Sequence, residues 1–324
     1  MSKSGSDRCR SRAFMEKIIA AIVTYNRREL LSEALNALTS QKQLSEILVI
    51  DNASTDGTEL MLAPLIERSQ IRYINTGKNL GGAGGFSLAL EEGVKAGADY
   101  IWIMDDDTIV TEHALDALLD QVRAHPEAAF FSSEALWTDG TPNKMNTHRL
   151  LEPEDGKQAV LCREATFVSL LVRKESVIRN GLPVREFFIW GDDIEYTRRL
   201  SFRESGYYVP GSIVVHKTKT NEGSNIVTDD PARLARYRYA YRNEIYIARE
   251  EGAIRWLRQF AKILYHSGKV LFLSKERKME KIRLIWASSA EGLSFNPPIR
   301  YVSDSAETNR PDHLKAETGF EIRK

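Results

Sequence analysis

The chain has little cysteine, no long apolar run and no net charge, and each shortage excludes a class of protein. Its 324 residues include only Cys9 and Cys162, which excludes a disulfide framework and favours a reducing compartment. No stretch reaches the ~18–20 apolar residues of a membrane-spanning helix, and the first 17 residues lack the apolar core of a signal peptide. The 45 basic residues balance 45 acidic ones, which argues against a nucleic-acid partner. These shortages predict a cytoplasmic globular protein.

Strand and helix patterns alternate four times in the first 125 residues. The strand patterns are short, apolar and rich in β-branched residues, and they cover 18–25, 46–50, 71–74 and 100–104. The helical patterns between and after them cover 28–40, 58–68, 86–96 and 111–125. This alternation predicts an α/β fold with a mostly parallel sheet sandwiched by helices. Such sheets bind ligands beyond the carboxyl ends of their strands, and polar residues follow each of these four strands.

Three adjacent aspartates, Asp105, Asp106 and Asp107, follow the apolar strand pattern at 100–104. Neighbouring carboxylates repel one another, and they are costly at the end of a buried strand unless a cation neutralises them. Mg²⁺ and Mn²⁺ prefer oxygen ligands, and Mg²⁺ commonly completes its shell with substrate phosphates. The triplet therefore predicts a metal and diphosphate site, and the alternative is a solvated acidic loop.

A glycine-rich segment, NLGGAGGF at 79–86, precedes the third helical pattern. Glycine allows close backbone approach and leaves N–H groups free ahead of a helix, which suits a phosphate or a sugar. Its spacing is not the dinucleotide fingerprint, and a plain turn is the alternative. Asp51, which begins DNASTDGT, is likewise either a turn residue or a nucleotide contact, and Asp56 is expected to belong to the turn.

A second acidic site is predicted at Asp192 and Asp193, in the first turn of a helical pattern. Inverting transfer of a sugar needs a carboxylate base that takes the proton from the attacking hydroxyl. This base must lie opposite the nucleotide, so a segment other than the metal aspartates should supply it. The alternative is that both residues are helix-capping acids. His216, which ends the strand pattern SIVVH, is by itself more typical of a core histidine.

In their order along residues 18–216, six motifs resemble the family 2 glycosyltransferases, which have the GT-A fold. The motifs are AIVTYNR, VIDNASTDGT, NLGGAGGF, IMDDDT, FFIWGDDIEYTRRL and GSIVVH. The resemblance implies a metal-dependent inverting glycosyltransferase with a nucleotide-diphosphate sugar donor and Mn²⁺ or Mg²⁺ as cofactor. Galactofuranosyltransferases are the most similar group and rhamnosyltransferases of bacterial surface polysaccharides come next, although Gly191 departs from the galactofuranosyl pattern. The expected donor is UDP-galactofuranose, with dTDP-rhamnose as the alternative.

The resemblance also implies roles for individual residues. Donor contacts are expected from Thr24, Tyr25, Asn26, Arg27, Asp51, Asn79, Gly81, Gly82, Gly84, Gly85, Asp105 and Asp106. Metal ligands are expected to be Asp105, Asp107 and His216. Asp193 is expected to be the base with Asp192 beside it, and acceptor contacts are expected from Trp190, Glu195 and Tyr196.

Four parts of the chain are expected. They are a flexible N-terminus at 1–17, a GT-A catalytic domain at 18–230, a helical basic and aromatic region at 231–300, and a loose tail at 301–324. The region 231–300 holds 15 Lys and Arg against 6 Asp and Glu, a surplus of 9. The resemblance implies that this region covers the acceptor side and that the acceptor is a glycolipid or oligosaccharide of surface polysaccharide such as O antigen. The aromatic and basic character of the region suits a lipid-linked acceptor at the inner face of the plasma membrane. A plain helical cap over the active site is the alternative.

Two other classes of protein remain as alternatives. A nucleotidyltransferase needs a glycine-rich basic loop directly after the first strand, where this chain has TYNRREL. An inactive sugar-binding scaffold would lack metal or base carboxylates, and here all are present.

Overall fold

A computed structural model describes residues 16–302, so nearly all of the predicted loose termini, 1–17 and 301–324, lies outside the described residues. Ten strands form one sheet in the order β3-β2-β1-β4-β9-β6-β10-β8-β7, with β5 paired to β10. The strands are β1 (Ile18–Thr24), β2 (Leu44–Asp51), β3 (Arg72–Asn75), β4 (Tyr100–Asp105), β5 (Thr108–Val110), β6 (Phe130–Leu136), β7 (Arg149–Leu150), β8 (Val160–Glu164), β9 (Ser169–Arg173) and β10 (Gly206–His216). The α-helices are α1 (Arg28–Leu38), α2 (Thr58–Glu67), α3 (Gly81–Lys95), α4 (Ala114–Ala124), α5 (Lys174–Asn180), α6 (Asp192–Ser201), α7 (Tyr237–Glu250), α8 (Ala253–Leu273) and α9 (Lys278–Ser294).

The first half of the sheet is parallel, and the second half is mixed. β1 lies between β2 and β4 and is parallel to both, with Thr24 opposite Asp51 and Val23 opposite Asp105. The polar residues after these strands therefore meet at one edge, as the alternating pattern predicted. β9 is antiparallel to both β4 and β6, and it joins the parallel half to the β6–β10 pair. The α/β fold with a sheet sandwiched by helices is confirmed, and the sheet is mixed.

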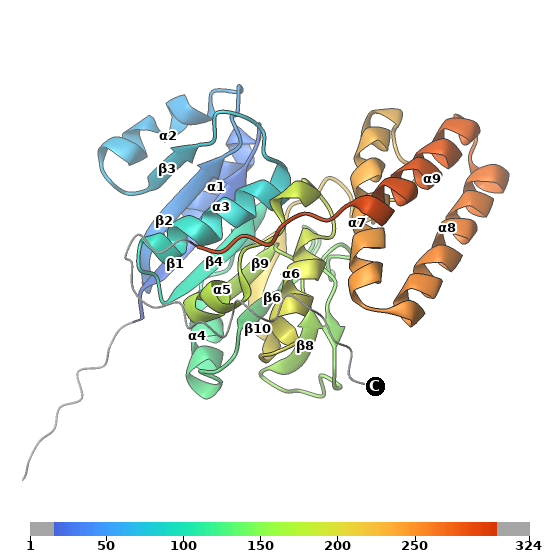
Figure 1. The fold of residues 1–324 in the computed structure, drawn as a ribbon. Helices are drawn as coiled ribbons and strands as arrows, with labels where there is room; N and C mark the ends of the chain where they lie inside the picture. Colours follow the sequence, from blue (N-terminus) through green and yellow to red (C-terminus); the bar gives the residue numbers. More distant parts are fainter. Residues whose placement is uncertain (1–15, 303–324) are drawn as a thin grey trace, which may run out of the picture.

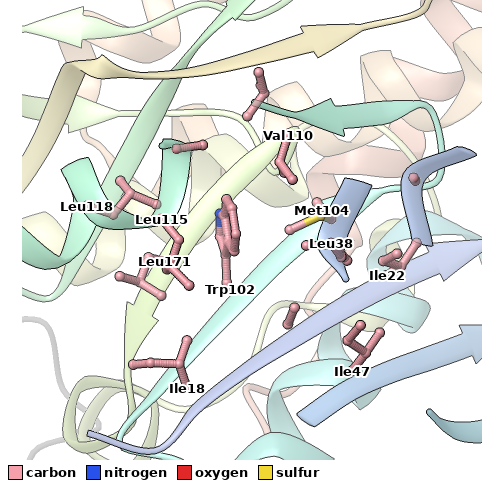
Figure 2. Packing of buried hydrophobic residues seen from close by; sticks show 14 of the residues in the cluster. Ile18, Ile22, Leu38, Ile47, Trp102, Met104, Val110, Leu115, Leu118 and Leu171 are labelled. Atoms are coloured by element: carbon pink, nitrogen blue, oxygen red, sulfur yellow. The ribbon is translucent and has the colours of Figure 1, made fainter. Parts of the chain in front are cut away.

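Alternating residues of β1 point to two separate cores, one on each face of the sheet. Ile18 and Ile22 pack with α1, α2 and α4, whereas Ile19 and Val23 pack with α3, α5 and α6. Figure 2 shows the first core, where Trp102 stands between the sheet and the α4 side chains. Its indole N–H donates to the Ser169 hydroxyl oxygen at 2.9 Å, so the buried nitrogen is satisfied.

Helix α3 begins at Gly81, five residues before the predicted helix, so the glycine cluster forms its first turns. The side-chain oxygen of Asn79 accepts from the Gly81 N–H at 2.8 Å, and that of Asn52 accepts from the Leu80 N–H at 3.3 Å. These two side chains satisfy N–H groups that a helix start leaves open. A Cβ on Gly85 would lie 2.4 Å from the Val23 side chain, so glycine lets α3 pack directly on β1.

Helices α7, α8 and α9 form a group beside the sheet, and α8 lies outermost in it (Figure 1). The chain then returns from α9 across the α3 and α5 side of the sheet, where the Leu182 N–H donates to the Arg300 carbonyl oxygen at 2.7 Å. In the part of the chain that the structure describes, no helix combines the length and the apolar character that crossing a bilayer requires.

We predict that Gly81→Ala lowers the melting temperature far more than Gly97→Ala does. Both glycines have left-handed φ angles, +72° and +76°, where alanine costs about 1–2 kcal/mol. Only at position 81 would the new Cβ also meet a backbone atom, the Phe188 carbonyl oxygen, at 2.1 Å. Thermal unfolding of both variants measures the difference, and equal losses would show that the loop at Phe188 simply moves aside.

Candidate active site at the carboxyl edge of the sheet

Asp105, Asp107 and His216 come together at the carboxyl edge of the sheet. One ligand atom from each lies within 4.8 Å of the others, although His216 is more than 100 residues away in sequence. The His216 Nε2 lies 3.1 Å from the Asp107 Oδ1. Two carboxylates and an imidazole are suitable donors for Mn²⁺ or Mg²⁺, and a set of this kind suggests a divalent metal.

Strand pairing explains why His216 arrives at the aspartates. After Asp107 the chain turns directly into the short strand β5, which runs antiparallel to β10 and pairs Thr108 with His216. The Lys217 N–H donates to the Asp107 carbonyl oxygen at 2.8 Å and extends this pairing by one residue. The ligand set is therefore built by backbone hydrogen bonds, and it does not depend on flexible side chains alone.

The electrostatics of the three residues fit a cation. Burial and the neighbouring Asp107 raise the pKa of Asp105 to about 7. Although burial acts in the opposite direction, His216 and Arg27 lower the pKa of Asp107. Burial lowers the pKa of His216, but the negative charges of Asp107 and Asp105 have the larger effect. The pKa of His216 is therefore raised above its usual value. Asp107 Oδ1 is buried without a hydrogen bond of acceptable geometry, which is the state expected of a metal-ligand atom.

Asp106 turns away from this set and holds the first predicted donor motif. Its Oδ2 accepts from the Thr24 hydroxyl at 2.8 Å and from the Tyr25 N–H at 3.4 Å, and its Oδ1 lies 3.3 Å from Arg27 Nη1. Burial raises the pKa of Asp106 to about 6 while Arg27 opposes this rise. Arg27 also pairs with Asp107, and its side chain is half exposed. The guanidinium can therefore contact both the aspartates and a ligand above them.

The first and second donor motifs are hydrogen-bonded to each other. Asn26, in the left-handed region at φ 52°, donates its N–H to Ser54 Oγ at 2.8 Å and accepts from the Thr55 N–H at 2.7 Å. Asp51 is fully buried, and its two oxygens accept from the Ser54 N–H at 2.9 Å and the Tyr73 hydroxyl at 2.7 Å. Asp51 therefore organises this turn within the protein.

The four glycines of the NLGGAGGF segment lie in the first turns of α3, and most of them are buried in packing contacts instead of forming an open loop. Gly81, Gly84 and Gly85 are buried, and only Gly82 is partly exposed. Asn79 is exposed beside them, with its side chain used as the cap of α3. A ligand can reach this segment through Gly82 and Asn79, whereas the other three glycines set the distance between α3 and its neighbours.

The second acidic site begins α6, directly after a strained turn. Phe188, Trp190 and Gly191 all have positive φ, at 65°, 66° and 87°. Burial and the adjacent Asp193 raise the pKa of Asp192 well above its usual value, and Asp105 adds to this rise. The pKa of Asp193 is raised to about 6, chiefly by burial. Backbone N–H groups oppose this rise, and the charge of Glu164 adds to it. The charge of Asp105 thus acts on Asp192, whereas the charges of Glu164 and Arg198 act on Asp193.

The three predicted acceptor residues do not lie in one place. Tyr196 is 0% exposed and packs edge-on against Phe167 in the core, with ring centroids 6.0 Å apart. Glu195 pairs with Arg199 at 2.7 Å, and Arg199 in turn donates to backbone carbonyl oxygens. Tyr196 is thus part of the core, with its hydroxyl buried and without a hydrogen-bond partner among the described residues, and Glu195 is paired with Arg199 of its own helix. Trp190 remains partly exposed, with its ring 5.2 Å from that of Tyr237.

A cavity of about 400 Å³ lies between α6, α7 and α8. Trp190, Gly191 and Ile194 line it on the side of the second acidic site. Glu164 and Arg198 also line it, and these two residues are the charged groups that affect the pKa of Asp193. Gly191 and Ile194, the residues on either side of Asp192 and Asp193 in sequence, line the cavity, but the two aspartates themselves do not.

Asn243 on α7 is a residue that the sequence patterns did not reveal. It is fully buried, and its Nδ2 lies 3.0 Å from the Phe187 carbonyl oxygen, 3.2 Å from that of Ile189 and 2.9 Å from that of Trp190. Its Oδ1 accepts from the Arg242 Nε at 3.1 Å, which fixes the amide so that its nitrogen faces the turn. One side chain thereby holds the strained turn before the second acidic site.

The sheet and the helices that cover it have the GT-A fold seen in solved glycosyltransferases. Residues 19–172 match the model of Glycosyl transferase family 2, so this chain carries a family 2 glycosyltransferase domain and is a glycosyltransferase. It is similar to the galactofuranosyltransferase GlfT1 of Mycolicibacterium smegmatis, with 28% identity over 269 residues. The match covers 75% of this chain and 87% of GlfT1.

Solved structures show the same fold at low sequence identity. The mannosyltransferase PcManGT of Pyrobaculum calidifontis, in complex with GDP-Man and Mn²⁺, has a TM-score of 0.52 and 14% identity, covering 89% of this chain and 78% of that protein. Staphylococcus aureus TarS has a TM-score of 0.53 and 14% identity, covering 86% of this chain. This chain spans only 44% of the length of TarS.

We predict that Asn243→Leu, which keeps the side-chain volume but removes the amide donor, lowers kcat by about 10²-fold. The turn before Asp192 and Asp193 would lose its hydrogen bonds and shift, while the donor side of the site stays in place. Steady-state kinetics and calorimetry test this as a fall in kcat with an unchanged Kd for the nucleoside diphosphate. A parallel loss of donor affinity, or a normal kcat, would contradict the positioning role.

Proposed function

We propose that this protein is a metal-dependent inverting glycosyltransferase that moves galactofuranose from UDP-galactofuranose onto a lipid-linked or oligosaccharide acceptor. The observation that carries the proposal is the pairing of two acidic sites at one sheet edge. Asp105 and Asp107 lie with His216, and Asp192 and Asp193 begin α6, where the charge of Asp105 helps to raise the pKa of Asp192. Inverting transfer needs this division between a group that holds the diphosphate and a base that faces the acceptor.

The donor side would be held by the chain in two ways. Asp105, Asp107 and His216 would hold a divalent cation, which would supply positive charge near the donor diphosphate. Arg27 is half exposed beside the same aspartates and adds a second positive group. Asp106 fixes Thr24 and Tyr25, so the first motif has a defined shape before the donor arrives. Preorganised charge of this kind lowers the barrier without rearrangement during the reaction.

Asp193 is proposed as the base, and Asp192 as its buried neighbour. Asp193 is partly exposed and electrostatically linked to Glu164 and Arg198, which line the cavity. A base should be accessible to the acceptor and should have a pKa close to the working pH. The pKa of Asp193, about 6, meets the second condition. Its Oδ1 accepts from the Ile194 N–H at 2.7 Å, which orients the carboxylate.

The proposed donor sugar rests on similarity to GlfT1, a galactofuranosyltransferase. A nucleotide donor is also consistent with TarS, whose first 349 residues have been crystallised with UDP. The acceptor would enter the cavity beside Asp193, where Arg255, Arg258 and Lys262 favour an anionic group such as a lipid diphosphate. An acceptor of this type lies in a membrane, so we also propose peripheral association with the inner face of the plasma membrane.

We predict that turnover is lost in excess chelator and that the donor stabilises the protein only with metal. With Mn²⁺, UDP-galactofuranose at 100 times its Kd should add about 2.7 kcal/mol of stability, and dTDP-rhamnose should add less. His216→Ala should weaken Mn²⁺ binding because it removes one of three ligands. The matched control is His113→Ala on the exposed start of α4. Equal stabilisation without metal, or the same Mn²⁺ titration in both histidine variants, would contradict the metal assignment.

We predict that Asp193→Asn lowers kcat by about 10²–10⁴-fold and leaves donor and Mn²⁺ affinity unchanged. The base must be ionised, so kcat of the unchanged enzyme should fall as the pH drops through about 6, the pKa of Asp193. Asp192→Asn is the matched comparison. The assignment within the pair is wrong if Asp192→Asn abolishes turnover while Asp193→Asn keeps it. Normal activity in both variants would remove the whole second site from the mechanism.

A further inference from the structure

Helix α8 has a broad apolar face that the rest of the described chain leaves exposed. An α-helix turns about 100° per residue, so the positions that share one side of α8 can be read from their spacing. Gln259, Ile263 and Val270 lie on the buried side, against α7 and α9. The opposite side carries the outer apolar face, which consists of Ile254, Leu257, Leu264, Tyr265, Leu271 and Phe272.

The exposure of this face is unusual for a soluble surface. Ile254 is 73% exposed, Leu257 67% and Phe272 80%. Scattered apolar residues on a surface need no explanation, but a continuous apolar stripe along a helix marks an interaction site. The stripe runs the length of a 21-residue helix and lies on the outermost element of the helical group (Figure 1).

Cations border the outer apolar face along one side. By the same spacing, Arg255, Arg258, Lys262 and Lys269 form a stripe between that face and the buried side. Two of them have partners within the helical group, since Arg255 lies 3.4 Å from Glu251 and Lys262 lies 2.7 Å from Glu244. Helix α8 itself contains no acidic residue, and residues 253–294 hold 9 Lys and Arg against 3 Glu. The outer apolar face of α8 is thus bordered along one side by positively charged residues.

We propose that the outer apolar face of α8 docks in the plane of an anionic lipid surface, with its cationic stripe at the level of the headgroups. A helix with an apolar face and a basic border, too polar to cross a bilayer, has the character of an interfacial helix. A second copy of this chain fits less well, because two such faces would bring like charges together. A lipid surface supplies the complementary negative charge.

This inference rests on the proposed lipid-linked acceptor and says how the protein would meet it. Arg255, Arg258 and Lys262 line the cavity beside Trp190 and also form part of the cationic stripe. Docking through α8 would therefore bring the cavity close to the headgroups. An acceptor diphosphate could then enter from the surface while its lipid stays in the bilayer.

The test is flotation of the full chain with phosphatidylcholine vesicles, with and without phosphatidylglycerol, at low and high salt. The apolar variant is Leu257→Gln with Phe272→Gln, and its matched control is Leu60→Gln, an 81% exposed leucine on α2. The charge variant is Lys269→Glu in the cationic stripe together with Lys275→Glu, an exposed residue just past the end of α8, and neither residue lines the cavity. Solution hydrolysis of UDP-galactofuranose and light scattering are measured on every variant, so the proposed function and self-association are followed separately.

We expect the unchanged protein and Leu60→Gln to float with anionic vesicles at low salt and to lose binding at high salt. The apolar variant should bind at least about tenfold more weakly, and the charge variant should lose its preference for phosphatidylglycerol, with hydrolysis unchanged in both. Normal flotation of the apolar variant would overturn the docking face, as would an α8-dependent dimer that does not bind vesicles. Lost hydrolysis in the unchanged protein would instead contradict the proposed function and leave docking standing.

Discussion

Three neighbouring carboxylates at the end of a buried strand set the main constraint on this structure. Asp105, Asp106 and Asp107 repel one another, and neighbouring groups compensate the charge of two of them. Asp106 accepts a hydrogen bond from the Thr24 hydroxyl in the first motif. Asp107 pairs with Arg27 and with His216 at the end of β10. The mixed half of the sheet has a functional consequence here, because the antiparallel β5–β10 pairing brings His216 to the aspartates.

The second acidic site depends on a different kind of support. Its preceding turn has positive φ at Phe188, Trp190 and Gly191, a conformation that persists only when the surroundings hold it. Asn243 supplies that hold from α7 through three carbonyl oxygens, and Gly81 of α3 packs against the Phe188 carbonyl on the other side. The helical region is therefore linked directly, through Asn243, to the turn that precedes the second acidic site.

Much of the fold could be predicted from local sequence patterns, because buried parallel strands and amphipathic helices leave clear periods. The convergence of the motifs at one edge followed from that alternation. The early start of α3 could not be predicted, since its cap comes partly from Asn52, a residue on another turn. Tyr196 and Glu195 lie beside the predicted base in sequence, yet helix geometry turns them inward. Asn243 carries no local signal, because its partners are backbone atoms more than 50 residues away.

The central claim is that Asp105, Asp107 and His216 bind one divalent cation together with the donor diphosphate. The most direct measurement is anomalous scattering at the manganese edge from crystals grown with Mn²⁺ and UDP. The account predicts one strong peak in contact with all three side chains and with the diphosphate oxygens. A structure in which UDP is bound but the manganese peak is absent, or lies away from His216, would contradict it.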